Sequence, residues 1–335
     1  MQSPRPVTLK ALAQELGLNA STVSRVLKDP TDESGRWASP GTAARILELA
    51  DQRGYRRNPH AASLRTARSN MIGVIVPRLQ DYVLATIYEG IDQAASARGY
   101  FTMVSNSLDD EDARRVKVER LLEQRVDGLI FGDARFDQMS VFEELDRRDF
   151  PHVLVSRRVP NQVSVTCDDV RGGQLMADHL WDQGRRTFGV IAGRAGTSTS
   201  HDRTGGFVDR LRERGVPETD IRVVHGGFDT AAGRIAADEL LSRGDAPEAI
   251  FATNDFAAIG ALGALQARGM RIPDDVALCG YNDTPLAAGV NLTSVGSPMH
   301  EMGVRGLELL CEMLGGARPE SELLTPTLVI RASTA

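Results

Sequence analysis

Short apolar runs alternate with helical patterns along most of the chain, from residue 71 to residue 335. The runs that read as strands are Ile72–Val76, Phe101–Val104, Gly128–Phe131, Val153–Val155, Phe188–Ile191, Ala249–Ala252 and Val276–Cys279. Helical periodicity falls between and after them, at about 84–97, 111–124, 139–148, 172–183, 202–214, 231–242, 255–268 and 299–314. This alternation predicts parallel sheets covered by helices on both faces. Because the stretch is too long for one comfortable open sheet, we expect two stacked α/β lobes with a cleft between them.

Polar and aromatic side chains follow the predicted strands, in the segments 77–82, 156–158, 193–203, 254–255 and 281–283. In the third segment, the stretch Thr197–His201 is expected to be a flexible loop. A lone Asn or Asp at such a place is usually a turn or a helix cap. Ligands of such sheets, however, bind beyond the carboxyl ends of the strands. The convergence of these segments therefore predicts a pocket for a small hydroxyl-rich or heterocyclic ligand.

The first 57 residues show a different pattern, of three short helices. Thr8, Asn19 and Ser39 can cap them, Pro40 suits the first turn of the third, and Gly17 permits a tight turn between the first two. Each helix has one apolar face, made by Leu9, Leu12, Ala13 and Leu16, by Val23, Val26 and Leu27, and by Ala43, Ile46, Leu47 and Ala50. The pattern fits a helix-turn-helix whose second helix offers a short polar face and one arginine to a DNA major groove. It fits equally well a small helical bundle for protein contact.

Charge separates the same two parts of the chain. Residues 1–69 hold eleven Lys and Arg and six Asp and Glu, a net charge of +5, while the remainder carries −11. This asymmetry favours a polyanion-binding head on a body with another task, although chance alone also produces such an excess.

The sequence shows no run of eighteen apolar residues and no apolar N-terminal stretch, so we expect no membrane span and no secretory signal. Cys167, Cys279 and Cys311 are scattered and odd in number, which indicates neither a disulfide framework nor a zinc cluster. The cytoplasm is the expected location.

Between the two parts, Asn58-Pro59 is a typical helix start, and the helix that follows has room for about two turns. So short a helix is marginal in water, so it would need a partner to persist.

The segments Pro6-Val7-Thr8-Leu9 and Gly17-Leu18-Asn19-Ala20-Ser21-Thr22-Val23-Ser24-Arg25-Val26-Leu27 closely resemble the headpiece of LacI/GalR transcription regulators. The resemblance implies that Ala20, Ser21 and Arg25 read bases. Thr22 and Ser24 would help to hold phosphates, and Thr8 belongs to the same DNA-binding set.

The same resemblance makes the short segment a hinge helix that pairs with its dimer mate in the minor groove. The DNA-contacting residues that it implies there are Asn58, Ala61, Leu64 and Arg65. Leu64 would wedge between base pairs and bend the DNA. The alternative for Leu64 is that it packs against the body.

The rest of the chain resembles the family core, a type I periplasmic-binding-protein fold, over essentially its whole length. Matching segments include Val126–Ile130, Gly189–Gly193, Asn254-Asp255 and Gly280–Asp283. By position, the effector pocket would hold Tyr82, Arg157, Thr199, Arg203, Phe228, Asn254 and Asn282. The resemblance implies that Arg203 grips ring oxygens or hydroxyls and that Phe228 stacks on a sugar or a base.

Three features depart from the family pattern. Asn19 replaces the usual serine, but either residue can cap a helix. The loop Asp29–Trp37 is longer than its counterpart, and the sequence offers no explanation for it. Asn282 stands where an aspartate commonly binds sugar hydroxyls, which leaves the ligand class less defined. The chain also ends near Ala335 with no leucine heptad, so we expect a dimer and not a tetramer.

Dehydrogenases, kinases and hydrolases share the alternation of strands and helices. The sequence, however, contains no GxGxxG, no P-loop, no GxSxG and no HExxH motif, and its six histidines are scattered. We therefore predict no enzyme, no cofactor and no metal.

The expected fold is a helix-turn-helix headpiece at 1–57, a hinge helix and linker at 58–70, and a two-lobed α/β core at 71–335. The N-lobe would contain about 71–166 and 298–324, and the C-lobe about 167–297 and 325–335. We predict a homodimeric transcription regulator, a repressor, that binds a pseudo-palindromic double-stranded DNA operator and is controlled by a small effector between the lobes. A sugar or sugar-like effector is the first expectation and a nucleoside or purine the second. The rival is a solute-binding protein of the same fold without a transcriptional role.

Overall fold

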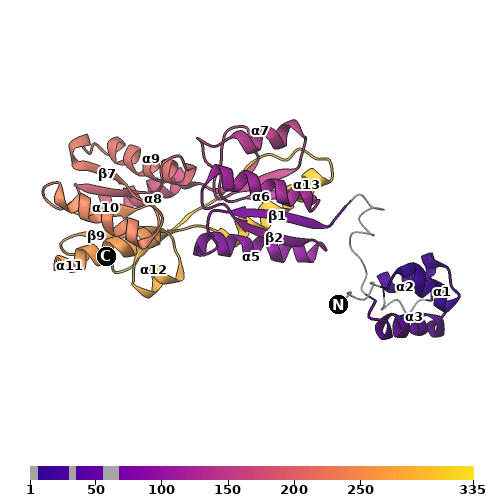
Figure 1. The fold of residues 1–335 in the computed structure, drawn as a ribbon. Helices are drawn as coiled ribbons and strands as arrows, with labels where there is room; N and C mark the ends of the chain where they lie inside the picture. Colours follow the sequence, from indigo (N-terminus) through magenta and orange to yellow (C-terminus); the bar gives the residue numbers. More distant parts are fainter. Residues whose placement is uncertain (1–6, 30–34, 56–67) are drawn as a thin grey trace, which may run out of the picture. The chain divides into compact units, whose positions relative to one another are not determined.

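The computed structural model describes residues 7–29, 35–55 and 68–335 (Figure 1). The chain divides into two compact units, Met1–Ser69 and Asn70–Ala335, named the headpiece and the core below. The predicted hinge helix at 58–65 lies outside the described residues. Among the described residues, no helix is both long and apolar enough to cross a membrane.

The described part of the headpiece contains α1 (Leu9–Leu16), α2 (Ala20–Lys28) and α3 (Pro40–Gln52). The predicted capping residues are confirmed, since each one accepts a hydrogen bond from a backbone N–H in the first turn of its helix: Thr8, Asn19 and Ser39. Gly17 ends α1 at a φ of 66°, a left-handed conformation that glycine adopts without strain. The apolar faces meet in one small core made by Leu12, Ala13, Val23, Val26, Ile46 and Ala50.

The core contains two sheets, one in each lobe (Figure 1). In the N-lobe the order is β11-β5-β4-β3-β1-β2, and all neighbours are parallel. Its strands are β1 (Met71–Val76), β2 (Phe101–Asn106), β3 (Gly128–Phe131), β4 (His152–Val155), β5 (Ser164–Cys167) and β11 (Glu322–Leu324). In the C-lobe the order is β12-β10-β9-β8-β6-β7, with only β12 antiparallel to its neighbour. Its strands are β6 (Phe188–Ala192), β7 (Ile221–His225), β8 (Ala249–Ala252), β9 (Ala277–Asn282), β10 (Thr293–Gly296) and β12 (Thr327–Val329).

Helices cover both faces of each sheet. The N-lobe has α5 (Tyr82–Ala97), α6 (Glu111–Glu123), α7 (Ser140–Arg147) and α13 (Met299–Leu314), and the C-lobe has α8 (Asp169–Asp182), α9 (Ser198–Glu213), α10 (Thr230–Ser242), α11 (Asp255–Ala267) and α12 (Pro285–Gly289). On β1, Val74 packs in the cluster of α5 and α13, whereas Ile75 packs in the cluster of α6 and α7. Successive side chains of a strand point to opposite faces, so both faces of the sheet are buried. The predicted two-lobed α/β fold is confirmed.

The chain passes between the lobes after β5, after β10 and after β11. These passages bring α13 and β11 back to the N-lobe and return β12 to the C-lobe. The two lobes are therefore joined by three connecting segments, an arrangement that allows hinge motion between rigid bodies.

Helices α5 and α13 cross at a pair of glycines. A Cβ atom on Gly303 would lie 2.0 Å from the carbonyl oxygen of Ile87, and one on Gly90 would lie 2.1 Å from that of His300. The two backbones can approach this closely only because neither position carries a side chain.

We therefore expect Gly303→Ala to lower the free energy of unfolding by about 1–3 kcal/mol, because the methyl group forces the helices apart. Urea denaturation of the full chain measures this change. Gly205→Ala is the matched control, since its Cβ would meet nothing within 4 Å. It should be neutral or stabilising, by up to about 1 kcal/mol. Equal unfolding midpoints for the two variants would contradict the close-crossing explanation.

One predicted loop is wrong. The stretch Thr197–His201 is not a flexible loop, because α9 begins at Ser198 with Thr197 as its N-cap. Small hydroxyl residues have modest helix propensity and favour turns, which explains the prediction. In the structure Ser198, Thr199 and Ser200 are buried, so tertiary packing decides the local conformation.

Among the described residues, five strands and two short helices have no counterpart in the sequence prediction: β5, β7, β10, β11, β12, α12 and the 3-10 helix Glu218–Asp220. β5 and β10 contain buried Ser and Thr side chains, so they lack the apolar run that marks a buried strand. Hydrogen bonds satisfy these groups; Thr293, for example, donates from Oγ1 to the carbonyl of Arg331 at 3.0 Å. β7, β11 and β12 lie at or beside sheet edges, where short strands need fewer apolar residues.

Candidate nucleic-acid interface and effector site

Helix α2 presents a polar face to solvent. Val23 and Val26 are buried in the headpiece core, whereas Ser21 and Arg25 are exposed. The predicted DNA-contacting residues of this helix lie within its first two turns: Ala20, Ser21, Thr22, Ser24 and Arg25. Apart from Arg25, their side chains are short, which allows close approach of the helix backbone to a groove.

The first turns of α1 and α2 are fixed by side-chain caps. Asn19 Oδ1 accepts hydrogen bonds from both the backbone N–H and the hydroxyl of Ser21, each at 2.9 Å. Thr8 Oγ1 accepts from the backbone N–H of Ala11 at 3.2 Å. Both helices thus begin at defined points, and helix N-termini attract phosphate through their free N–H groups.

Four predicted DNA-contacting residues, Asn58, Ala61, Leu64 and Arg65, lie outside the described residues. Their contact with the minor groove therefore stays a prediction.

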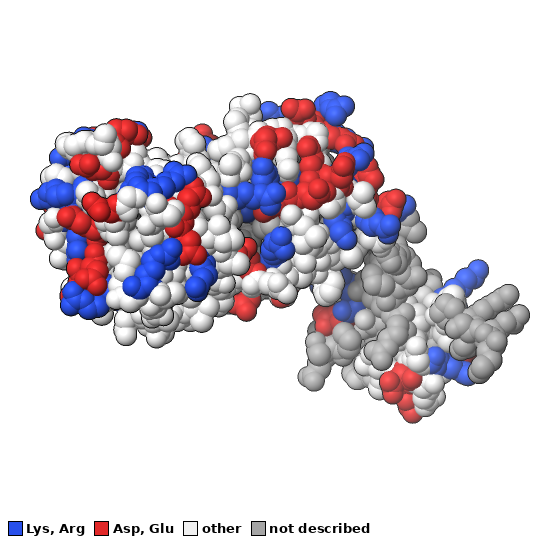
Figure 2. Space-filling view, turned by 60° about the vertical axis from the view of Figure 1, so that its left-hand side comes forward, with Lys and Arg blue, Asp and Glu red and all other residues white. Residues whose placement is uncertain are grey.

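Figure 2 shows one face of the core, on which basic and acidic side chains are interspersed and do not form a continuous basic patch. A polyanion would meet both signs of charge on that face. In the part of the chain that is described, no group of three or more His, Cys, Asp or Glu side chains is arranged to hold a metal ion.

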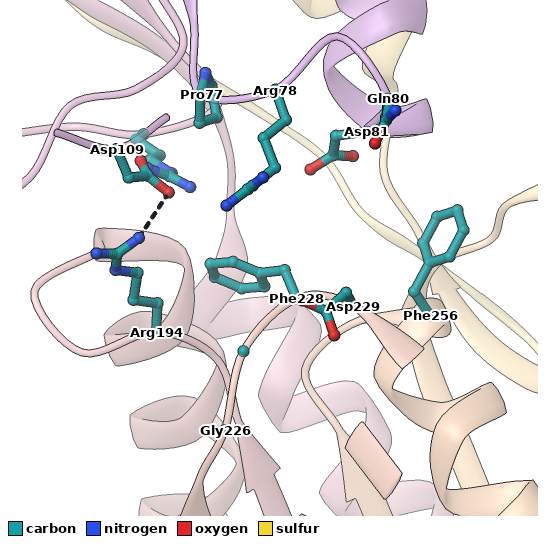
Figure 3. Close-up of a pocket in the computed structure, with 12 residues that line it drawn as sticks. Pro77, Arg78, Gln80, Asp81, Asp109, Arg194, Gly226, Phe228, Asp229 and Phe256 are labelled. Atoms are coloured by element: carbon teal, nitrogen blue, oxygen red, sulfur yellow. Dashed lines mark hydrogen bonds and ion pairs between the residues drawn. The ribbon is translucent and has the colours of Figure 1, made fainter. Parts of the chain in front are cut away.

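A cleft of about 550 Å³ opens between the lobes of the core (Figure 3). The N-lobe contributes Pro77, Arg78, Gln80, Asp81, Asp109 and Arg157, and the C-lobe contributes Arg194, Gly226, Gly227, Phe228, Asp229 and Phe256. A smaller hollow adjoins it, sharing Asp81, Arg157 and Phe228 and lined further by Val83, Leu84, Ser156, Thr199, Arg203, Asn254 and Asn282. Most of these residues follow the carboxyl ends of parallel strands, where ligands of such sheets bind.

The two hollows gather six of the seven residues predicted for the effector pocket. Arg157 and Phe228 line both, and the smaller hollow adds Thr199, Arg203, Asn254 and Asn282. Tyr82, the first residue of α5, lines neither of them and is 38% exposed.

In the cleft, the Asp109 carboxylate pairs with two arginines. It accepts a hydrogen bond from Arg157 Nη1 at 2.6 Å and one from Arg194 Nη1 at 3.5 Å (dashed in Figure 3). Arg157 and Asp109 are both buried, so a low dielectric strengthens their attraction. Because Arg194 belongs to the C-lobe and Asp109 to the N-lobe, the second contact crosses the cleft.

Further contacts join the lobes beside the cleft. Arg158 of the N-lobe pairs with Asp202 of α9 at 2.8 Å, and its backbone N–H donates to Ser198 Oγ at 2.9 Å. The backbone N–H of Phe136 donates to the carbonyl of Gly196 at 2.9 Å. A change in the lobe angle must break or rearrange these polar contacts.

Arg203 is held in place by the protein. Its Nε donates to Asp169 Oδ1 at 2.9 Å and its Nη1 to the carbonyl of Thr253 at 2.8 Å. Its guanidinium carbon lies 3.8 Å from the centroid of the Tyr281 ring. Burial raises the pKa of Asp169, and the guanidinium opposes that shift. Only the remaining N–H groups of Arg203 are left for a ligand.

The two asparagines of the smaller hollow differ. Asn254 is used structurally: its Oδ1 accepts from the backbone N–H of Ala257 at 2.7 Å, and its Nδ2 donates to the carbonyl of Phe228 at 2.8 Å. Asn282 has a φ of 101° and is 3% exposed, and its buried Oδ1 has no hydrogen-bond partner among the described residues. An unsatisfied buried acceptor costs about 1–3 kcal/mol, so a donor on a ligand would find a prepared partner there.

This architecture is similar to that of known proteins in sequence and in structure. A periplasmic binding protein-like domain matches residues 177–334. The HTH-type transcriptional regulator DegA of Bacillus subtilis (strain 168) is 33% identical over 336 residues, which span 98% of this chain and 98% of DegA. The Lac repressor dimer bound to operator and the anti-inducer ONPF is similar in structure, with a TM-score of 0.87, 25% identity, and coverage of 98% of this chain and 99% of that one. The chain belongs to the LacI family of transcriptional regulators.

Among solved structures, this LacI-family regulator is also similar to the complex of the transcriptional regulator CelR with cellobiose. The TM-score is 0.74 and the identity 27%, over 98% of this chain and 99% of CelR.

In this LacI-family chain, several cleft residues were not singled out from the sequence: Arg78, Asp81, Asp109, Arg194, Asp229 and Phe256. Arg78, Asp81 and Arg194 lie in the strand-end segments 77–82 and 193–203, so the strand-end rule contains them without ranking them. Asp109 is harder to find, because β2 runs to Asn106, two residues past the predicted end of that strand.

Behind the smaller hollow of this LacI-family core, Asp255 is a buried titratable group. It accepts hydrogen bonds from the backbone N–H of Thr284 at 2.7 Å and from Ser294 Oγ at 2.6 Å. Burial raises the pKa of Asp255 from 3.8 to about 6.

A raised carboxyl pKa makes the folded state bind more protons than the unfolded state, so the contribution of Asp255 is full below about pH 4 and is lost as the pH rises through about 6. We expect the free energy of unfolding of the natural chain, relative to Asp255→Asn, to fall by about 2–3 kcal/mol between about pH 4 and pH 7. Urea denaturation of both proteins across this range measures the difference. A difference that is constant or grows with pH would show that burial does not raise the pKa of Asp255.

Proposed function

We propose that this chain is the subunit of a homodimeric repressor that binds a pseudo-palindromic operator and responds to a small metabolite in the core cleft. The observation that carries the proposal is the combination, in one chain, of the solvent-facing polar surface of α2 with a ligand-sized cleft between two lobes. The Lac repressor is described as a dimer on operator DNA, which supports the same assembly here. A regulator of transcription acts where the chromosome is, so the cytoplasm remains the proposed location.

On the DNA side, Arg25 would donate two hydrogen bonds to a guanine edge, the commonest specific contact in the major groove. Ala20 and Ser21, on the same face, would read neighbouring bases. Thr22 and Ser24 would contact phosphates, and Thr8 would do so from the start of α1. Contacts of this second kind fix the register of the protein on the duplex without reading the sequence.

The hinge segment completes the proposed interface. Asn58, Ala61 and Arg65 would contact the minor groove, and Leu64 would wedge between central base pairs. Unstacking a base step costs a few kcal/mol, which the wider contact with bent DNA offsets.

On the effector side, the polar groups of the cleft favour a sugar or a sugar-like polyol. Asn282 Oδ1 is a buried acceptor without a partner among the described residues, and a hydroxyl group supplies the donor that it needs. Carboxylates and guanidinium groups both line the larger hollow, with Arg78 extending into it (Figure 3). Hydroxyl groups donate and accept, so a polyol can satisfy both kinds of group. The cellobiose complex of CelR supports this class.

A nucleoside is the second candidate. The cleft contains Phe228 and Phe256, whose side chains both lie at its C-lobe wall (Figure 3). A planar base could stack on an aromatic face, while its ribose hydroxyls reach the same polar groups.

The link between the two sites would be the lobe angle. A ligand that prefers one arrangement of the lobes shifts the population toward it, by its differential affinity and no more. In a twofold dimer such a shift changes the distance between the two hinge segments and hence the affinity for the operator. The sign of the response is set by which arrangement the ligand prefers.

Thermal unfolding of the full chain against a panel of sugars and nucleosides tests the effector class. A ligand at one hundred times its Kd stabilises the folded chain by about 2.7 kcal/mol. We expect a sugar to give this shift, Asn282→Leu to remove it, and Asn282→Asp to retain it, because aspartate still accepts hydrogen bonds from hydroxyls. A shift from nucleosides alone would replace the sugar by the second candidate.

Mobility-shift assays with DNA selected from a random pool test the regulator itself. Selective binding at moderate salt is expected, since salt suppresses binding that rests on phosphate contacts alone. Equal affinity for selected and random duplexes would favour a solute-binding protein without a transcriptional role.

A further inference from the structure

Trp37 contacts the arginine that the proposed interface depends on. The guanidinium carbon of Arg25 lies 4.6 Å from the centroid of the Trp37 ring, well within the range of a cation–π interaction. Trp37 precedes the N-cap of α3 by two residues and is half-buried against the apolar core of the headpiece. Packing against the headpiece core therefore holds the Trp37 ring in place, while Arg25, the side chain that it contacts, is exposed.

The N–H groups of the Arg25 guanidinium make no hydrogen bond within the described part of the headpiece. No ion pair or hydrogen bond joins this group to another described residue, although the side chain lies over the ring. A ring that covers one face of a planar guanidinium does not use the in-plane N–H donors of that group. Two of those donors are what guanine O6 and N7 require for a bidentate contact.

We propose that Trp37 is a positioning residue for sequence readout: it holds the Arg25 guanidinium in the orientation that reads a base. The inference rests on the proposed function, because Arg25 must face DNA for its orientation to matter. An arginine side chain has several rotatable bonds, and fixing them before binding removes an entropic cost of forming the contact. Trp37 is the last residue of the segment Asp29–Trp37, which the sequence alone leaves unexplained, and its contact with Arg25 gives this residue a role in specificity.

Arg36 adds a second cation at the same ring. Its guanidinium carbon lies 4.8 Å from the centroid of Trp37. Two like charges beside one ring repel each other, and a nearby phosphate would relieve that repulsion. We assign Arg36 to phosphate attraction and Arg25 to base readout, so the two arginines predict different responses to mutation.

The test uses the full chain, with an operator selected from random duplexes by the natural protein, and compares Kd on that operator and on random DNA. Trp37→Ala should weaken operator binding by about two- to five-fold and leave random DNA unchanged. Trp37→Phe should retain most of the affinity, because phenylalanine also offers a ring face. Combining Trp37→Ala with Arg25→Ala should cost no more than Arg25→Ala alone, since the ring acts through the arginine.

Arg36→Ala is the matched control at the same ring. It should weaken binding to both DNAs alike and reduce the salt dependence of log Kd by about one unit of slope. Circular dichroism of each variant, together with Trp37→Phe, separates loss of folding from loss of readout.

Two results would overturn the role of Trp37: equal losses on operator and random DNA, or additive losses in the double variant. A natural chain that selects no sequence at all would instead remove the proposed function. If the natural chain and Arg25→Ala behave as proposed but Trp37→Ala binds the operator normally, only the positioning role fails.

Discussion

Replacing Arg203 by alanine should lower the free energy of unfolding of the core by about 3–5 kcal/mol. Asp169 is almost fully buried, and Arg203 is the cation that pairs with it. Removing the guanidinium leaves an unpaired buried carboxylate and a gap beside the Tyr281 ring. Urea denaturation at neutral pH measures the loss.

The double variant Asp169→Asn with Arg203→Met separates the charge from the packing. Removing both charges together should recover most of the stability, because burying a neutral pair of similar volume costs far less than burying an unpaired charge. If Arg203→Ala alone unfolds at the same urea concentration as the natural chain, the ion pair is not the structural element that its burial indicates. The result also bears on the effector site, since loss of ligand response in Arg203→Ala must be judged against loss of folding.

Replacing Arg25 by alanine should weaken specific operator binding by about 1–3 kcal/mol, which is roughly a 5- to 150-fold rise in Kd. Arg25 is exposed on the polar face of α2, and no hydrogen bond or ion pair from another described residue occupies its donors. Fluorescence anisotropy with labelled selected and random duplexes measures both affinities. Lys28→Ala, one turn further along the same helix, is the matched control and should affect both duplexes alike, as a phosphate contact does. An equal loss on random DNA for Arg25→Ala would remove it from base readout.

The sequence predicts local structure well where the chain itself supplies the signal. Thr8, Asn19 and Ser39 cap the helices that their positions indicate, because capping is an interaction over three residues or fewer. It fails where the signal comes from the rest of the molecule. The hydroxyl-rich start of α9 is helical and buried because tertiary contacts surround it, and neither periodicity nor propensity contains those contacts.

The candidate site shows the same division. Strand-end reasoning and the family resemblance bring together Arg157, Phe228 and Asn282 from three distant parts of the chain. They do not show that Asn254 is consumed as a cap or that Arg203 is committed to Asp169. Which polar group is free for a ligand depends on its partners, and those partners are fixed only by the fold.

The same reasoning applies to the loop Asp29–Trp37. From the sequence alone this segment has no explanation, whereas in the structure the guanidinium carbon of Arg25, on α2, lies 4.6 Å from the centroid of the Trp37 ring. A long-range contact between Arg25 and Trp37 thus converts an unexplained insertion into a specific hypothesis about DNA readout.

The central claim is that the cleft and the DNA-binding face are coupled. Its most direct test is the operator affinity of the full chain, measured at increasing concentrations of a ligand that the thermal-unfolding panel identifies. Coupling between the two sites predicts a change in operator Kd of at least about five-fold, with an equal and reciprocal change in ligand Kd when operator is bound. An operator Kd that stays constant from zero to saturating ligand, with the ligand demonstrably bound in the cleft, would contradict it.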